Sequence, residues 1–205
     1  MYKSLIVKNL NKSFNNLNVF HGISFEVKPG TIVNLSGPNG SGKTTLMKII
    51  SSQILDYEGE VIVGDKNIID FDKEIFSMIY YVAPYSSLYE HLTLSENIDF
   101  FIALNNLKDN NQKNKLIKRF KLESHLSRKI HELSDGTRKK VSVLILFLIN
   151  PDFFILDEPY TYLDEESSLV LNELIYDYQK QGKSFLITDN SLASKNLNFN
   201  GVVEL

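Results

Sequence analysis

Cysteine is absent from this 205-residue chain, which excludes disulfide bridges and metal sites built on thiolates. The formal net charge is −3, so there is no general excess of positive charge that would favour nucleic acid. The longest apolar run, near 143–149, is far shorter than the roughly 20 residues that span a bilayer. The opening residues, MYKSLIVKNLNKSF, contain no apolar stretch long enough for a signal peptide. We therefore expect no nucleic-acid partner, and we expect any membrane role to depend on another protein.

Local patterns predict an alternation of strands and helices within one domain, 1–205. The expected strands are 5–7, 23–27, 32–35, 61–63, 79–82, 153–156 and 185–188. The expected helices are 43–51, one that begins after Thr93, 115–120, 137–148 and 165–181. Thr93 and Glu96 have the spacing of a capping box. This alternation predicts an α/β fold with a mainly parallel central sheet covered on both faces.

A glycine-rich segment follows the expected strand 32–35 and matches GxxxxGK[ST] at each fixed position. Glycines let successive backbone N–H groups point toward phosphate oxygens, and the next helix adds its positive dipole end. In such a loop Lys43 reaches the β- and γ-phosphates, and Thr44 is a ligand for Mg²⁺. The alternative is a glycine-rich turn with an accidental lysine, but a strand before it and a helix after it favour the phosphate loop. The predicted nucleotide-binding residues here are Gly37, Pro38, Asn39, Gly40, Ser41, Gly42, Lys43, Thr44 and Thr45.

Two acids, Asp157 and Glu158, directly follow the apolar run Phe-Phe-Ile-Leu at 153–156. The carboxyl end of a buried strand is where an α/β sheet places its ligands. Asp157 is predicted to bind Mg²⁺, and Glu158 to orient and deprotonate the attacking water. An acid pair after a strand is also compatible with a solvated turn or a helix cap. A phosphate loop earlier in the chain makes catalysis the better interpretation.

These motifs, in this order, resemble the ATP-binding cassette family, and in particular the nucleotide-binding subunits of transporters. The resemblance implies a P-loop NTPase with an N-terminal antiparallel β subdomain and a helical signature subdomain, approximately 85–148. The signature motif, usually LSGGQ, resembles Leu-Ser-Asp-Gly-Thr at 133–137. Ser134 and Gly136 would then contact the γ-phosphate bound by an opposing subunit. Taken without the family, Ser134 is simply a good helix N-cap.

Three further features rest on the same resemblance. Phe14 resembles the aromatic residue that stacks on adenine, although it could instead be a plain core residue. The segment 162–164 resembles the dimer-contact D-loop, where Asp164 could equally cap the next helix. A groove for a membrane subunit would be lined by aromatic and aliphatic residues that could instead pack within the subdomain: Tyr85, Leu88, Tyr89 and Leu92.

Several positions depart from the family pattern. Pro84 stands where the family usually has Gln, and a proline side chain offers neither donor nor acceptor. Asp135 and Thr137 replace Gly and Gln of the signature, and Asp189 aligns with the switch His. An ionised carboxylate cannot donate a hydrogen bond to a γ-phosphate and repels it. Because Glu158 is retained, we expect slow hydrolysis with ATP binding intact.

The resemblance implies an ABC-type ATPase that uses ATP and Mg²⁺. Its expected partners are a membrane permease subunit and a second ATP-binding subunit, which would place it peripherally on the inner face of the cell membrane. In length and general pattern, the chain also resembles the short cassette subunits of haem exporters (cytochrome c maturation). Alternative interpretations of the sequence are a non-hydrolytic partner in a heterodimer, a soluble cassette ATPase acting on DNA or the ribosome, and a P-loop kinase. The signature-like segment argues against the kinase, and the absence of tandem cassettes or coiled-coil insertions argues against the soluble ATPase.

Overall fold

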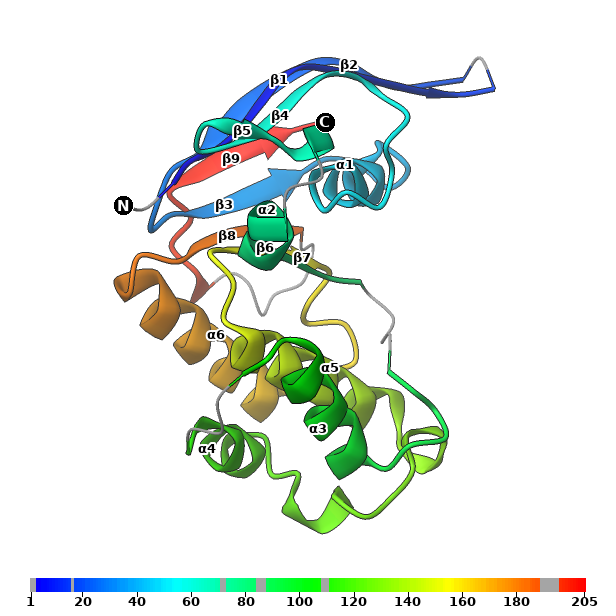
Figure 1. Ribbon diagram of the computed structural model, residues 1–205, viewed down its shortest axis with the longest axis vertical. Coiled ribbons are helices and arrows are strands. Elements are labelled where there is room, and N and C mark those ends of the chain that lie inside the picture. Colours follow the sequence, from blue (N-terminus) through cyan, green and yellow to red (C-terminus); the bar gives the residue numbers. More distant parts are fainter. Residues whose placement is uncertain (1–2, 16, 71–72, 84–87, 108–110, 189–195) are drawn as a thin grey trace.

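The computed structural model describes residues 3–15, 17–70, 73–83, 88–107, 111–188 and 196–205, without the side chains of Lys73, Glu74 and Phe76. It contains two β-sheets and a group of helices (Figure 1). The first sheet is antiparallel in the order β2-β1-β4-β5, with β1 Leu5–Phe14, β2 Leu17–Val27, β4 Glu58–Val63 and β5 Lys66–Asn67. The second is parallel in the order β6-β7-β8-β3-β9, with β3 Ile32–Ser36, β6 Ile79–Val82, β7 Phe153–Asp157, β8 Ser184–Thr188 and β9 Gly201–Glu204.

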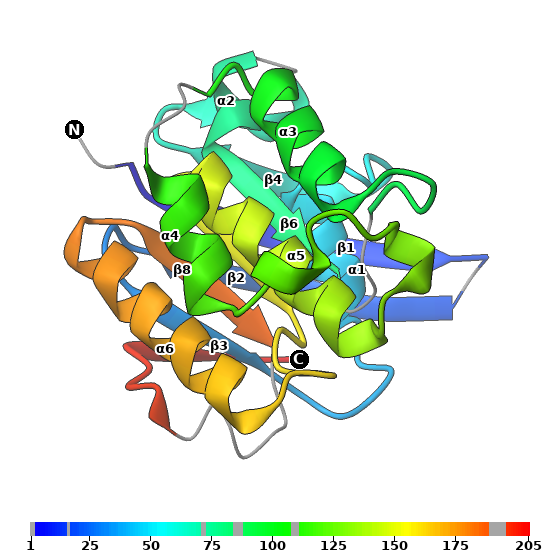
Figure 2. The same ribbon diagram turned by 90° about the horizontal axis from the view of Figure 1, so that it is seen from below.

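The helices are arranged on both sides of the parallel sheet (Figures 1 and 2). Helix α1 packs between the two sheets, whereas α5 and α6 lie side by side across the opposite face, with α3 and α4 beyond α5. The helix bounds are α1 Lys43–Ile50, α2 Lys73–Met78, α3 Leu94–Leu104, α4 Gln112–Arg119, α5 Asp135–Ile149 and α6 Glu165–Lys180. Three short 3₁₀ turns are η1 Ile68–Asp70, η2 Glu123–His125 and η3 Ile130–Glu132.

Alternating side chains of the central strands feed two separate cores. On β7, Phe153 and Ile155 pack toward α1 and the antiparallel sheet, whereas Phe154 and Leu156 pack toward α5 and α6. Because a strand points successive side chains to opposite faces, a strand covered on both sides must be apolar throughout. This is why the run at 153–156 shows no polar alternation.

Most of the expected elements are present, and several local signals are confirmed. Thr93 and Glu96 form the capping box at α3: the Thr93 N–H donates to Oε2 of Glu96 at 2.7 Å, and the Glu96 N–H donates to Oγ1 of Thr93 at 3.2 Å. Ser134 caps α5 and Asp164 caps α6. The fold class is confirmed as α/β with an antiparallel β subdomain and a parallel sheet. Elements that the sequence patterns did not predict are β5, β9, α2 and the 3₁₀ turns.

Candidate nucleotide-binding site

The phosphate loop connects the end of β3 to the start of α1. Its last glycine, Gly42, has φ +101°, and a Cβ there would lie 2.5 Å from Cγ1 of Val19. Both the conformation and the close approach therefore require glycine. Lys43 is 9% exposed, and its Nζ donates to the carbonyl oxygens of Gly37 at 2.7 Å and Pro38 at 2.8 Å. The ammonium is thus held against the loop by backbone carbonyls that do not cancel its charge.

One polar atom of this loop has no hydrogen-bond partner among the described residues. The hydroxyl oxygen of Ser41 is buried, and its hydrogen-bonding capacity is unused. Buried polar groups nearly always have a partner, and an orphaned one needs an explanation. A hydroxyl donor inside a loop of N–H groups and beside an ammonium fits an oxygen-rich anion such as a polyphosphate.

Asp157 is 2% exposed at the carboxyl end of β7 and accepts hydrogen bonds from three hydroxyl groups. Thr44 Oγ1 donates to its Oδ2 at 2.7 Å, and Thr188 Oγ1 donates to its Oδ1 at 2.7 Å. The Tyr81 hydroxyl donates to Oδ2 at 3.1 Å. The pKa of Tyr81 is raised, first by burial and then by the charge of Asp157 and the hydrogen bond to it. The two predicted metal ligands, Thr44 and Asp157, are therefore in direct contact.

Sequence reasoning did not single out Tyr81 and Thr188. Both lie near the carboxyl ends of strands that flank β7, and Asp157 and Thr188 are register partners across β7 and β8. Identifying them from the sequence would have required the strand order, because the carboxyl ends of neighbouring parallel strands meet at one edge of a sheet.

Glu158 follows Asp157 with a backbone φ of +46°, a value that non-glycine residues rarely adopt. Its N–H donates to the carbonyl oxygen of Thr188 at 3.1 Å and to Oγ1 of Thr188 at 3.0 Å. The side chain is half-buried, with its Oε2 3.4 Å from the hydroxyl of Thr161. Strain of this kind persists where surrounding contacts hold it, often at functional sites.

A cavity of about 440 Å³ joins the phosphate loop to both acids and to Phe14. Phe14 is 47% exposed, and the Nζ of Lys12 lies 4.4 Å from its ring centroid. Phe14 is therefore not a plain core residue, and one face of its ring already holds a cation. The cavity is lined by Phe14, Val19, Asn39, Gly40, Gly42, Lys43, Thr44, Thr45, Asp157 and Glu158.

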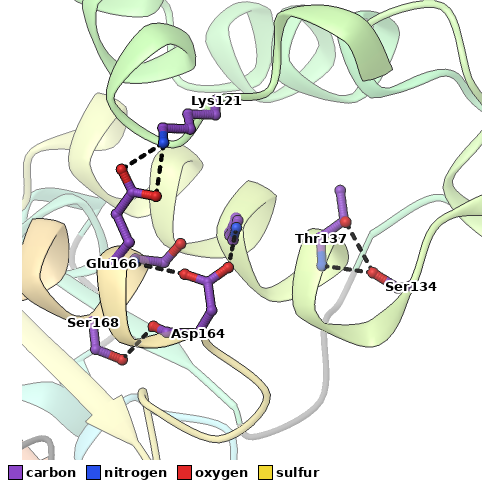
Figure 3. A network of polar contacts seen from close by, with 8 residues as sticks. Lys121, Ser134, Thr137, Asp164, Glu166 and Ser168 are labelled. Atoms are coloured by element: carbon purple, nitrogen blue, oxygen red, sulfur yellow. Dashed lines mark hydrogen bonds and ion pairs between the residues drawn. The ribbon is translucent and has the colours of Figure 1, made fainter.

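The signature-like segment lies on the helical subdomain, and the described residues that line the cavity do not include Ser134 or Gly136. Ser134 caps α5, and its Oγ accepts from the N–H of Thr137 at 3.3 Å (Figure 3). Asp135 is exposed, with its Oδ1 3.8 Å from a guanidinium nitrogen of Arg138. The predicted roles of Ser134 and Gly136 toward a second subunit stay predictions.

Gly136 also has a role within the chain. A Cβ on this residue would lie 2.7 Å from the carbonyl oxygen of Tyr162, in the D-loop-like segment. Tyr162 itself has φ +69°. The signature-like and D-loop-like segments therefore pack against each other through backbone, and a side chain at 136 would push them apart.

Ion pairs also link the start of α6 and its cap to α5 and to Lys121, which follows α4 (Figure 3). Lys140 pairs with Asp164 at 2.6 Å, and Lys121 pairs with Glu166 at 2.6 Å. The hydrogen bond from Lys140, followed by that from Ser167, lowers the pKa of Asp164 to about 2. Asp164 accepts from the Ser167 N–H at 2.7 Å, so it serves both as the cap of α6 and as a link to α5.

The groove predicted for a membrane subunit is only partly described. Leu88 packs against the helical core, whereas Tyr89 is 49% exposed and contacts the ring of Phe100 edge-on at 4.6 Å between centroids. Leu92 is half-buried. Three residues named from the sequence lie outside the described residues: Pro84, Tyr85 and Asp189.

A family model described as ABC transporter matches residues 20–161 of this chain. The chain belongs to the ABC transporter family. An ABC transporter ATP-binding protein from Methanocaldococcus jannaschii is 31% identical over 195 residues, which are 94% of this chain and 70% of that protein. A spermidine/putrescine import ATP-binding protein from Fusobacterium nucleatum is 30% identical over 181 residues, or 85% of this chain. The match is 48% of the Fusobacterium protein, so the chain spans about half the length of that relative.

Solved structures agree with this assignment. A structure titled as the ATP binding subunit of an ABC transporter has a TM-score of 0.89 and 28% sequence identity, over 98% of this chain and 85% of that one. The ABC cassette is thus a P-loop NTPase fold in which the two sheets and the helices keep the arrangement described above. Within the described residues, no helix is both long and apolar enough to cross a bilayer.

Proposed function

We propose that this ABC domain binds and hydrolyses ATP, and that it couples these events to substrate movement through a separate membrane subunit. The observation that carries the proposal is the continuous cavity from Phe14 through Lys43 to Glu158. It brings an exposed aromatic ring, a phosphate-cradling loop and a carboxylate pair to one place. These groups match the adenine, the phosphates and the attacking water in turn.

In this proposal each residue has one task. Phe14 stacks on the adenine, and residues 37–45 wrap the phosphates with backbone N–H groups and the Lys43 ammonium. The side chain of Glu158 accepts a proton from the water that attacks the γ-phosphate. Ser134 and Gly136, at the N-terminus of α5, face the nucleotide of a second ATP-binding subunit, so that ATP is held between two chains.

The residues present fit a magnesium ion. The hydroxyl of Thr44 and the carboxylate of Asp157 are hard oxygen ligands that already touch at 2.7 Å. Among the described residues, no group of three or more His, Asp or Glu side chains is arranged to hold a metal. Mg²⁺ usually takes only one or two protein ligands and fills its sphere with phosphate oxygens and water, and when bound it offsets phosphate charge. Thr44 and Asp157 would hold it here.

We further propose that hydrolysis is slow while ATP binding is intact. Pro84 and Asp189 replace side chains that contact the γ-phosphate region in the family, and Asp135 adds an exposed carboxylate at the N-terminus of α5. Glu158 is nevertheless present, which favours a reduced rate over no activity. The same departures support a second candidate, a non-hydrolytic partner in a heterodimer.

The partners proposed are a membrane permease subunit and a second ATP-binding subunit, with the chain attached to the inner face of the cell membrane through the permease. Residues 1–205 act as a single ATP-binding domain in this proposal. The two relatives named above are called an import ATP-binding protein and an ABC transporter ATP-binding protein, which supports transport. The narrower likeness to short haem-exporter cassettes stays a prediction.

Steady-state ATP hydrolysis by the assembled complex tests the proposal. We expect turnover well below that of family members with Gln and His at positions 84 and 189, and its loss in Glu158→Gln. Asp189→His should raise the rate. A normal rate that Glu158→Gln abolishes would overturn slow hydrolysis, and a complete absence of turnover with intact ATP binding would favour the non-hydrolytic partner.

A further inference from the structure

A buried lysine on α5 has no part in the mechanism proposed above. Lys139 is 2% exposed, and its Nζ donates to the carbonyl oxygen of Ala83 at 3.1 Å. Ala83 directly follows β6, so the ammonium reaches from α5 to the carboxyl edge of the parallel sheet. This edge also carries Asp157 and Glu158. A lysine is almost never fully buried unless an opposite charge accompanies it.

The acid pair supplies that opposite charge. Burial lowers the pKa of Lys139 to about 8, while the charges of Asp157 and Glu158 act the other way and raise it. The ammonium is therefore charged at neutral pH. It lies at the same edge of the sheet as the two carboxylates, because Val82, next to Ala83, pairs with Leu156, next to Asp157. Burial weakens screening by solvent, so a charge interaction at this depth is stronger than one on the surface.

Among the described residues, the side-chain hydrogen-bond partners of the acid pair are neutral. Asp157 accepts from the hydroxyls of Thr44, Tyr81 and Thr188, and Glu158 accepts from that of Thr161. The ammonium of Lys43 donates to two backbone carbonyls of its own loop. An anionic ligand entering the cavity would therefore meet two carboxylates whose charge Lys139 offsets.

We propose that Lys139 is a positioning residue that acts as the internal counter-charge of Asp157 and Glu158, and that it strengthens the binding of a polyphosphate ligand most when no divalent cation is present. This inference rests on the proposed nucleotide site. A bound magnesium ion would offset the same carboxylates, so the ammonium matters less once the metal is there. A purely structural lysine would affect binding equally in both conditions.

The test compares ATP affinity in EDTA with ATP affinity in excess Mg²⁺, by calorimetry on the full chain. Lys139→Met should weaken binding about tenfold in EDTA, as expected for the loss of one buried, poorly screened charge, and by about threefold or less with Mg²⁺. Lys139→Arg keeps the charge and should bind ATP like the wild type. Lys139→Gln keeps a donor for the Ala83 carbonyl but loses the charge, and it should behave like Lys139→Met even if the methionine variant folds poorly.

Lys183→Met is the matched control. Its ammonium also donates to a backbone carbonyl, that of Asn150 at 3.2 Å, and pairs with Asp152 at 2.9 Å, with its side chain 16% exposed. It precedes β8 and so lies at the opposite edge of the sheet from the cavity. Its ATP affinity should match the wild type in both conditions.

The possible results distinguish a failure of the role of Lys139 from a failure of the proposed ATP-binding function. Wild-type protein that fails to bind ATP overturns the proposed function. Wild-type binding with an equal loss in EDTA and Mg²⁺ for Lys139→Met and Lys139→Gln, or with no loss in either, overturns the role of Lys139 alone.

Discussion

Replacing Lys139 with methionine should change how the stability of the nucleotide-free protein depends on pH. In the folded chain burial lowers the pKa of this lysine from the ordinary 10.5 to about 8. Between these values the unfolded chain binds more protons than the folded one. The free energy of unfolding of the wild type therefore rises with pH across this window, and Lys139→Met lacks this contribution.

The size of the effect follows from the same two values. From about pH 7 to about pH 9.5 the wild type should gain about 2 kcal/mol of stability relative to Lys139→Met. The lost hydrogen bond to Ala83 shifts the methionine variant by a constant amount, so the slope is the quantity to compare. The scan stops near pH 9.5 because burial raises the pKa of Tyr80 and Tyr178 to about 12, and this lowers stability as the pH rises above about 10.

Urea unfolding at a series of pH values measures this difference. The chain has no tryptophan, so far-ultraviolet circular dichroism is the suitable signal. Lys183→Met, in which a second lysine loses its charge at the far edge of the sheet, controls for the loss of a lysine charge as such. If the curves of the wild type and Lys139→Met run parallel over this range, burial does not lower the pKa of Lys139 in the folded chain, and this prediction is wrong.

Three further outcomes are expected. Gly136→Ala should destabilise the protein by about 1–3 kcal/mol in urea unfolding, because its Cβ would meet the Tyr162 carbonyl oxygen at 2.7 Å. Gly201→Ala, with no atom within 4 Å of the new Cβ, should lower the free energy of unfolding by less. Equal losses in the two variants would contradict the packing argument. Phe14→Ala should weaken ATP binding about tenfold in a direct titration, since base stacking on an aromatic ring typically contributes about 1–3 kcal/mol, and unchanged affinity would exclude stacking. Asp164→Asn keeps a capping side chain but loses the charge, so its stability deficit should be full above pH 3.8 and vanish as the pH falls through about 2; a deficit that persists at the lowest pH would point to the cap instead.

The phosphate loop and the acid pair could be predicted from sequence because each is a continuous stretch with its own local physics. GxxxxGK[ST] needs a strand before it and a helix after it, and β3 and α1 provide them. The caps Thr93, Ser134 and Asp164 are equally local, since each side chain bonds a backbone N–H three residues ahead.

The contacts that surround the acid pair could not be predicted in this way. Tyr81 on β6 and Thr188 on β8 hydrogen-bond Asp157, and Lys139 on α5 acts on both acids through its charge. Nothing in the sequence next to these three residues marks them. Their meeting depends on the strand order β6-β7-β8 and on where α5 crosses the sheet. The contact between Gly136 and Tyr162 is of the same kind, because it joins two loops through backbone alone.

Strands at the edges of the sheets were also difficult to predict from the sequence. Strand β9, Gly201–Glu204, contains only two consecutive apolar residues, and half of its residues are exposed. Its sequence therefore resembles that of a loop. Its place beside β3 comes from backbone pairing, including Leu35 with Val203, and not from a hydrophobic run. Similarly, β1 extends to Phe14 far beyond the apolar residues 5–7, because its second half pairs with β2 and its pairing with β4 continues as far as Asn11.

A calorimetric titration of the purified chain with Mg-ATP, beside the variant Lys43→Ala, tests most directly whether the loop 37–45 binds the nucleotide. We expect saturable binding of one nucleotide per chain, and a loss of at least tenfold in affinity in the variant, because a charge-assisted contact to phosphate is removed. Unchanged affinity in Lys43→Ala, or no binding by the wild type, would contradict the claim that the loop 37–45 is the nucleotide site.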